Sequence, residues 1–280
     1  MERQRVSIAN GGLEAAVAGS GPVTVVFESG LGTPLEVWDL VLPRVIERAR
    51  TLRYDRRYAP EAGPVAKRTV ADLLHDLEAL LAALALEPPY VLVGHSWGGV
   101  IARLFACAHP SHVAGLVLVD ATHEAVDSWK LELLPAINVV IRALSQAKSV
   151  QRGLIRQLCP SRSSPGYRAR VERRLNDPAL RAVGFRTSRA EGAAIRPALA
   201  QLRRDCEELP PTPTHVLTAG GVKSKMAQAN RNAWQATAGR AANARYTNVP
   251  TSGHMMPIDA PEAVTDAIVG VLDRVQPTAR

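Results

Sequence analysis

The chain has few of the features that mark membrane, secreted or metal-binding proteins. None of its 280 residues lies in a run approaching the ~18 consecutive apolar residues that a membrane-spanning helix requires. Residues 1–5 lead into a short alternating segment rather than into the apolar core of a signal peptide. The three cysteines, Cys107, Cys159 and Cys206, cannot all pair and lack the spacing of metal ligands. We therefore expect a cytoplasmic protein with no membrane span and no metal site.

Aromatic residues are also scarce, at 4% of the chain, and no stripe interleaves them with basic residues. The formal net charge is +8, which would suit a nucleic acid or an anionic substrate as a partner. An excess of arginine on solvated faces explains the same charge without any partner. Without a basic and aromatic stripe, we expect a small-molecule substrate and no nucleic acid, and the sequence indicates no oligomeric state.

One pentapeptide carries most of the chemical information. Residues 90–93 are a short apolar run typical of a buried strand, and Gly94-His95-Ser96-Trp97-Gly98 follows as a match to G-x-S-x-G. Residues 100–107 then have the composition of a helix. Such a pentapeptide alone can be an ordinary glycine-rich turn. In this strand–turn–helix context it predicts an exposed serine nucleophile at a sharp turn, with glycines where a Cβ would crowd the backbone.

Two backbone amides are candidates for an oxyanion hole, the pair of donors that stabilises a negatively charged oxygen during acyl transfer. The amide of Trp97 would lie at a helix N-terminus, where partial positive charge favours an oxyanion. Residues 23–27 form another apolar strand, and the loop Ser29-Gly30-Leu31-Gly32 follows it. That loop could supply the Leu31 amide as the second donor, or it could be an ordinary turn between a strand and a helix.

A serine hydroxyl needs a base to accept its proton as it attacks. Of the seven histidines, His254 is the best candidate, because it follows a late strand (residues 244–249) and adjoins Gly253. His95 adjoins the serine, but a tight turn would direct its side chain away. We therefore expect His95 to be structural.

The acid that orients the histidine is identified partly by an absence. No Asp or Glu occurs between Glu208 and Asp259, so the loop after the strand at 214–220 cannot supply it. Asp120 directly follows the apolar run 113–119 and would lie at the same edge of the sheet as the serine. Asp120 could instead cap the next segment. The other candidate acids are Glu124, Asp127 and Asp259.

The alternation of strands and helices predicts a mostly parallel sheet with helices on both faces. A hairpin with an Asn10-Gly11 turn is expected near the start, a helix over residues 35–49, and a loop over residues 59–64. Residues 121–210 contain no convincing strand and hold 16 Lys and Arg against 9 Asp and Glu. We expect residues 1–120 and 211–280 to form the core, with 121–210 as a helical cap or lid insertion, or else a solvated helical decoration.

The chain resembles the α/β-hydrolase superfamily in four features. These are the order of nucleophile, acid and histidine, the sharp turn at Ser96 (the serine elbow), the loop at residues 29–32 and the loop that contains His254. The resemblance covers residues 1–120 and 211–280 and implies an α/β fold with an eight-stranded, mostly parallel sheet. It also implies that the amides of Leu31 and Trp97 form the oxyanion hole. Two departures stand out: Ser29-Gly30 replaces the frequent His-Gly, and the usual acid after the seventh strand is missing. The second departure gives that role to Asp120, as in the subset that uses the sixth strand.

These features predict a serine hydrolase that needs no cofactor and cleaves a small ester, lactone or thioester. Ser96 would be the nucleophile, His254 the base and Asp120 the acid. The serine argues against the dehalogenase and epoxide-hydrolase branches, which the resemblance associates with Asp at this position. A C–C hydrolase, an acyltransferase and a ligand receptor without catalysis remain alternatives, because a fold does not fix a function.

Overall fold

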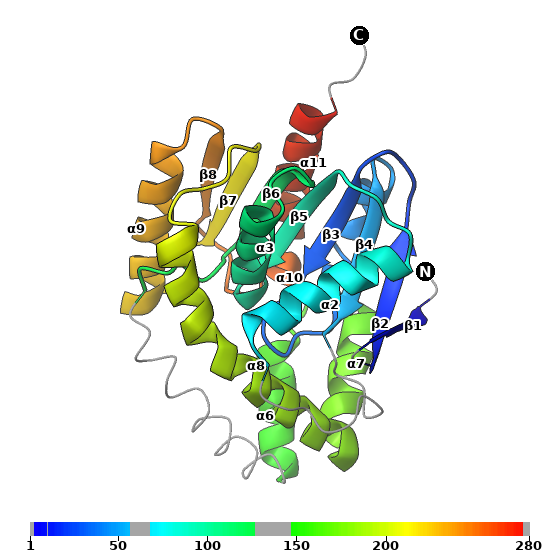
Figure 1. Ribbon diagram of the computed structural model, residues 1–280. Coiled ribbons are helices and arrows are strands. Elements are labelled where there is room, and N and C mark those ends of the chain that lie inside the picture. The colour runs from blue at the N-terminus through cyan, green and yellow to red at the C-terminus, as the bar shows by residue number, and fades with distance from the viewer. Residues whose placement is uncertain (1–2, 10, 57–67, 127–146, 277–280) are drawn as a thin grey trace.

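The computed structural model describes residues 3–9, 11–56, 68–126 and 147–276. Its centre is an eight-stranded sheet in the order β1-β2-β4-β3-β5-β6-β7-β8 (Figure 1). The pairings β1–β2 and β2–β4 are antiparallel and the others are parallel, which confirms the predicted α/β fold with a mostly parallel sheet. The strands are β1 (Gln4–Ile8), β2 (Gly11–Ala18), β3 (Thr24–Glu28), β4 (Arg50–Asp55), β5 (Tyr90–His95), β6 (Val113–Val119), β7 (Thr214–Ala219) and β8 (Ala244–Val249).

Helices cover both faces of the sheet because its central strands are apolar on both sides. In β3, Val25 and Phe27 pack on one face, whereas Val26 packs on the other. The first face is covered by η1 (Leu35–Trp38), α1 (Leu42–Ile46), α10 (Met256–Asp259) and α11 (Pro261–Val275). The second is covered by α2 (Val70–Ala83), α3 (Trp97–Ala108) and α9 (Lys225–Arg240).

Two local predictions need correction. The continuous helix expected over residues 35–49 is instead the short helix η1 followed by α1. Pro43 has no N–H to donate to the carbonyl four residues earlier, but it is tolerated in the first turn of a new helix. In the predicted hairpin, Gly11 pairs with Ile8 and so belongs to strand β2 rather than to the turn. Asn10 and the predicted loop at 59–64 lie outside the described residues.

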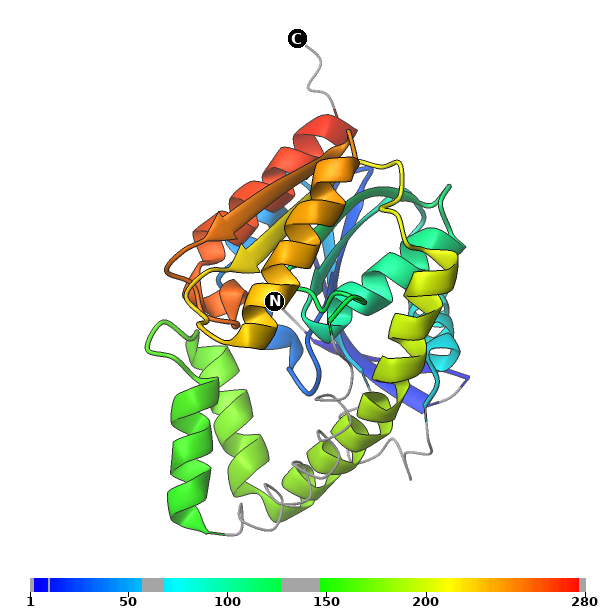
Figure 2. The same ribbon diagram turned by 90° about the vertical axis from the view of Figure 1, so that its left-hand side faces the viewer.

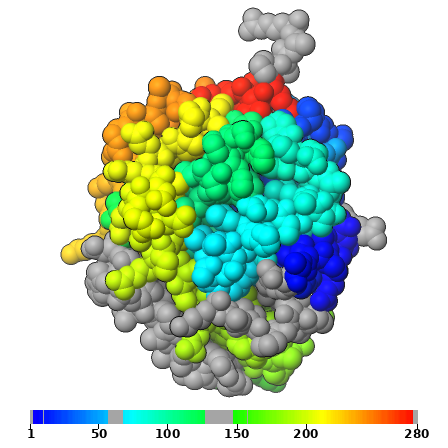
Figure 3. All heavy atoms as spheres, viewed as in Figure 1, coloured from blue at the N-terminus to red at the C-terminus, as the bar shows by residue number. Residues whose placement is uncertain are grey.

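Among the described residues between β6 and β7 are three helices, which we call the inserted helices: α6 (Lys148–Leu158), α7 (Pro165–Asn176) and α8 (Pro178–Asp205). They extend from one end of the sheet (Figure 2). The second half of α8 packs on α2 and α3 through a separate apolar cluster. Helices α2, α3 and α8 lie side by side on the face shown in Figure 3. The inserted helices thus contact the helix that follows Ser96.

The cysteines pair in a way that their spacing does not predict. Cys107, near the end of α3, forms a disulfide with Cys206, which directly follows α8. Cys159 is free and buried. The disulfide therefore joins the end of the inserted helices to α3.

Within the described ranges, no helix has the length and apolarity needed to cross a membrane.

Candidate active site

Ser96 lies at the junction of a buried strand and a helix. It separates β5 from α3 and has φ 54° and ψ −120°, a conformation that is unfavourable for a residue with a side chain. The turn is possible because the residues at positions 94 and 98 are glycines, which have no Cβ to collide with the closely packed backbone around them. A Cβ on Gly94 would lie 2.5 Å from the Gly99 Cα, and one on Gly98 would lie 2.2 Å from the Glu28 carbonyl oxygen. The elbow is therefore held between β3 and the first turn of α3.

Three side chains that are distant in the sequence meet at this elbow. The Ser96 Oγ lies 3.1 Å from Nε2 of His254, and Nδ1 of His254 lies 2.6 Å from an Asp120 carboxylate oxygen. Because an ionised carboxylate only accepts hydrogen bonds, Nδ1–H donates to Asp120, which leaves Nε2 to accept the Ser96 hydroxyl proton. The arrangement is a continuous hydrogen-bond chain from carboxylate to hydroxyl.

Asp120 is itself held at the end of the sheet. It directly follows β6 with φ 40°, and its second carboxylate oxygen accepts the Ala219 N–H at the end of β7, at 3.1 Å. The alternative acids are placed differently. The Glu124 carboxylate accepts from Arg103 on α3, and Asp259 lies in α10, where burial raises its pKa. Asp127 lies outside the described residues.

His95 has a contact that the sequence did not reveal. Its side chain is buried, and its Nε2–H donates to the backbone carbonyl oxygen of His254 at 2.8 Å. Burial lowers the pKa of His95 to about 3, so the ring is neutral at physiological pH. The expectation of a structural role agrees with this geometry. The residue supported by His95 is the histidine that contacts Ser96.

The loop formed by residues 29–32, which we call the 29–32 loop, is held by side chains from several elements. The Trp38 indole N–H donates to the Ser29 hydroxyl oxygen at 3.0 Å. Arg56, which follows β4, donates to the carbonyl oxygens of Ser29 and Gly30 at 2.7 and 3.1 Å. Arg56 is not recognisable from the sequence, because no motif links it to a loop more than twenty residues earlier.

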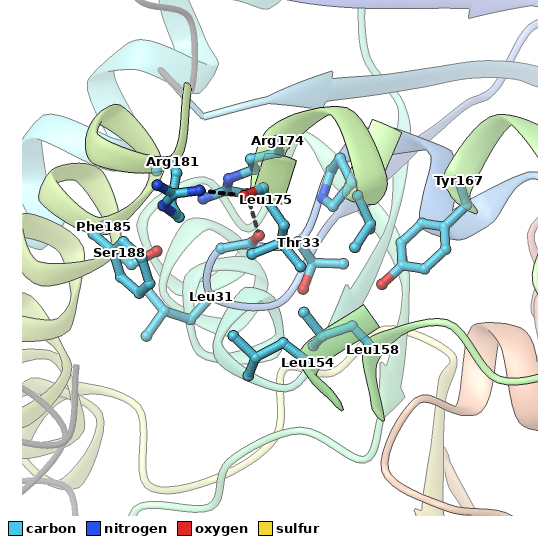
Figure 4. Close-up of a pocket in the computed structure, with 14 residues that line it drawn as sticks. Leu31, Thr33, Leu154, Leu158, Tyr167, Arg174, Leu175, Arg181, Phe185 and Ser188 are labelled. Atoms are coloured by element: carbon cyan, nitrogen blue, oxygen red, sulfur yellow. Dashed lines mark hydrogen bonds between the residues drawn. The ribbon is translucent and has the colours of Figure 1, made fainter. Parts of the chain in front are cut away.

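Among the described residues, two cavities lie beside this region. One, of about 290 Å³, is bordered by Leu31 and extends among the inserted helices. Figure 4 shows its apolar wall, with Leu154 and Leu158, and the guanidinium groups of Arg174 and Arg181 lying together on the opposite side. The second cavity, also of about 290 Å³, is lined by His254, Asp120 and side chains of α9. In the described part of the chain, no group of three or more His, Cys, Asp or Glu is placed to hold a metal ion.

Comparison with known proteins identifies the family. The model of the alpha/beta hydrolase family matches residues 25–267, which includes the whole hydrogen-bond chain described above. The chain belongs to the alpha/beta hydrolase family. This membership agrees with the eight-stranded sheet and confirms the resemblance inferred from the motifs.

Sequence relatives of this alpha/beta hydrolase match only in part. An uncharacterized protein of Bacillus subtilis, YqjL, is 40% identical over 103 residues, which cover 36% of this chain and 41% of YqjL. An AB hydrolase superfamily protein of Gibberella zeae is 29% identical over 108 residues, or 37% of this chain and 33% of that protein. The matches thus span less than half the length of these curated relatives.

Solved structures match this alpha/beta hydrolase over nearly its whole length. The epoxide hydrolase CorEH is 20% identical with a TM-score of 0.75, and the match covers 98% of this chain and 99% of that one. A thermophilic esterase from Thermogutta terrifontis is 23% identical with a TM-score of 0.70, and the match covers 98% and 99%. At these identities the similarity shows a shared fold.

Proposed function

We propose that the chain is a serine hydrolase that needs no cofactor and cleaves a small ester, lactone or thioester through an acyl-enzyme. The observation that carries the proposal is the hydrogen-bond chain from Asp120 through His254 to Ser96, with donor–acceptor distances of 2.6 and 3.1 Å. These distances lie in the range over which a base removes a proton from a nucleophile. Family membership supports the hydrolase chemistry.

In the proposed reaction, the Ser96 oxygen attacks the substrate carbonyl carbon while Nε2 of His254 accepts the hydroxyl proton. The carbonyl oxygen becomes an oxyanion, and His254 then returns the proton to the departing alcohol or thiol. A water molecule then attacks the acyl carbon while the same Nε2 accepts its proton. The bond between that carbon and the Ser96 oxygen breaks, the acid leaves, and Nε2 returns the proton to the Ser96 oxygen. Throughout the cycle Asp120 stabilises the imidazolium and holds Nδ1 protonated.

The amides of Leu31 and Trp97 are the proposed oxyanion donors. Trp97 begins α3, so its N–H is one of the amides that have no acceptor within the helix. Leu31 lies in the 29–32 loop. The backbone carbonyls of Glu28 and Ser29, just before Leu31, pack against Gly98 at the start of the same helix. Each such donor typically contributes about 3 kcal/mol of transition-state stabilisation.

The inserted helices are proposed to be a lid that shapes the substrate site, with residues 121–210 as the cap and 1–120 and 211–280 as the core. Supporting this, the cavity beside Leu31 is walled by all three inserted helices. Its apolar lining suits the acyl portion of a small substrate. Ester cleavage is favoured over epoxide opening because Ser96, rather than Asp, stands at the elbow.

Active-site labelling tests this proposal. A fluorophosphonate probe should modify the wild-type protein at Ser96, and a panel of p-nitrophenyl esters of graded acyl length should be hydrolysed. The Ser96→Ala variant is the matched control and should do neither while keeping its thermal unfolding temperature. Absence of both labelling and hydrolysis in folded wild-type protein would contradict the proposal. Ligand binding that is unchanged in Ser96→Ala would then favour a receptor.

A further inference from the structure

Arg56 connects the 29–32 loop to the inserted helices through a buried network. Its guanidinium donates to the carbonyl oxygens of Ser29 and Gly30, and also to the carboxylates of Glu28 and Glu191, at 2.9 and 3.2 Å. Glu28 ends strand β3, whereas Glu191 belongs to α8. The side chains of Arg56, Glu28 and Glu191 are 3%, 0% and 0% exposed, so water does not screen these contacts.

The contact with Gly30 bears directly on the proposed oxyanion donor. The carbonyl of Gly30 and the N–H of Leu31 belong to one planar trans peptide unit, in which they point in opposite directions. A guanidinium that fixes the carbonyl therefore fixes the direction of the N–H. The Thr33 N–H donates to the same carbonyl oxygen at 3.1 Å, so two donors hold it. Donation to a carbonyl also polarises its peptide unit and strengthens the N–H as a donor.

The inserted helices hold the loop on both sides of Leu31. On one side, Glu191 of α8 binds the guanidinium that holds the Gly30 carbonyl. On the other, the Arg174 guanidinium of α7 donates to the Gly32 carbonyl oxygen at 2.6 Å. Because the Gly30–Leu31 and Gly32–Thr33 peptide units are both restrained in this way, the position of the loop depends on how these helices pack.

Loss of one member of the network has a predictable physical cost. A buried charge without its partner is strongly unfavourable, so the remaining groups rearrange or admit water. Lysine at position 56 would keep the charge, but it cannot reach two carbonyls and two carboxylates at once, because it lacks the planar five-donor fork of arginine. Such a change would leave the Gly30 carbonyl held by the Thr33 N–H alone, and the direction of the Leu31 N–H would be less firmly fixed.

We propose that Arg56 is a positioning residue for the oxyanion hole and that Glu191 couples this position to the inserted helix α8. This inference rests on the proposed hydrolase function. Neither residue contacts the substrate in this account. Both act on the reaction through the Gly30–Leu31 peptide.

The test compares steady-state hydrolysis of p-nitrophenyl acetate by the wild type and Arg56→Lys. We expect kcat to fall about 10- to 100-fold in Arg56→Lys, with KM changed less than about threefold, because the Leu31 donor acts on the transition state. The affinity for an aliphatic trifluoromethyl ketone, which forms a tetrahedral oxyanion adduct with an active serine, should fall in parallel with kcat/KM. The Arg53→Lys variant is the matched control, since Arg53 is a buried arginine of β4 that binds Asp39.

A double-mutant cycle tests the coupling to α8. Glu191→Gln alone should lower kcat about 3- to 10-fold, and in the Arg56→Lys background it should have less than half that effect on a logarithmic scale. Additive effects would overturn the coupling, and an unchanged kcat and ketone affinity in folded Arg56→Lys would overturn the positioning role.

Two further controls separate the possible failures. If Arg56→Lys does not fold, Glu191→Gln takes its place, and an unchanged kcat and ketone affinity in that variant overturns the inference. Failure of the hydrolase proposal is distinguishable, because wild-type protein would then neither hydrolyse the ester nor react with the fluorophosphonate. If instead the wild type does both and Arg56→Lys behaves like it, the inference about Arg56 alone is wrong.

Discussion

At the scale of single residues, the candidate site combines side chains that meet directly with others that act on backbone groups. Ser96, His254 and Asp120 form the hydrogen-bond chain. His95 is not part of this hydrogen-bond chain but supports it, since it donates to the backbone carbonyl of His254. Replacing a residue of this hydrogen-bond chain should therefore lower the rate of the chemical step, whereas replacing a nearby carboxylate outside it should not.

The acid provides the first test at this scale. Asp120→Asn keeps the size of the side chain but replaces the carboxylate that accepts Nδ1–H of His254, so the histidine loses the tautomer that leaves Nε2 free. We expect kcat to fall about 10³-fold or more, by analogy with the same change in a serine–histidine–aspartate triad. Steady-state ester hydrolysis measures this.

Asp259→Asn is the matched control, because Asp259 is the other described aspartate considered as the acid. It lies in α10 beside Gly253 rather than in hydrogen-bond contact with His254. Its kcat should stay within about threefold of the wild type. A larger loss in Asp259→Asn than in Asp120→Asn would assign the acid to Asp259.

The sequence identifies some of these residues and not others, for physical reasons. Ser96 is visible because its turn needs glycines at fixed positions, and Asp120 because residues 209–258 contain no competing acid. Arg56 and Glu191 are not visible, since their contact joins residues 135 positions apart and depends on tertiary packing.

At the scale of secondary-structure elements, the elbow depends on the close approach of α3 to the end of β3. A Cβ on Gly98 would lie 2.2 Å from a backbone oxygen of Glu28, which cannot move as a flexible side chain would. Gly98→Ala should therefore separate the helix from the strand and lower the free energy of unfolding by about 1–3 kcal/mol. Urea denaturation measures the loss, and the rate of fluorophosphonate labelling should fall with it.

Gly270→Ala is the control for the same chemical change. Gly270 lies inside α11, and a Cβ there would meet nothing within 4 Å. Alanine has the higher helix propensity, so this variant should be as stable as the wild type or up to about 1 kcal/mol more stable. A Gly98→Ala variant with wild-type stability and labelling would show that the elbow does not require this approach.

Elements with a clear periodic pattern are predicted well, and those decided by one residue are not. The apolar runs of β3, β5 and β6 predict buried central strands, as observed. The segment after residue 35 has helical spacing throughout, yet Pro43 divides it into η1 and α1. Hydrophobic spacing indicates which face is buried, whereas the backbone donors decide where a helix ends.

At the scale of the whole molecule, the inserted helices are connected to the core by covalent and electrostatic contacts. The Cys107–Cys206 disulfide joins the residue after α8 to α3, and the Arg56–Glu191 pair joins the middle of α8 to the residue after β4. The sequence predicts that residues 121–210 are helical but not how they attach, because attachment depends on pairs distant in the chain. These contacts place α8 beside both the elbow and the 29–32 loop.

The stability of the whole molecule should depend on pH through its buried histidines. His123 is 5% exposed, and burial lowers its pKa to about 4 from an ordinary value of 6.5. Its Nδ1 accepts the Ala125 N–H and its Nε2–H donates to the Thr237 hydroxyl, so the folded state holds the neutral ring. Between pH 6.5 and 4 the unfolded chain binds a proton at His123 that the folded chain does not, so stability falls as pH decreases through this range.

His123→Gln isolates this contribution from those of other titrating groups. Glutamine offers a donor and an acceptor but binds no proton in this range, so the pH-dependent term from residue 123 disappears. Between pH 7 and pH 5 the free energy of unfolding of the wild type should fall by about 2 kcal/mol more than that of the variant. Urea denaturation at the two pH values measures both falls. Equal falls would show that the folded protein binds a proton at His123 as readily as the unfolded chain, which would contradict the neutral, buried ring.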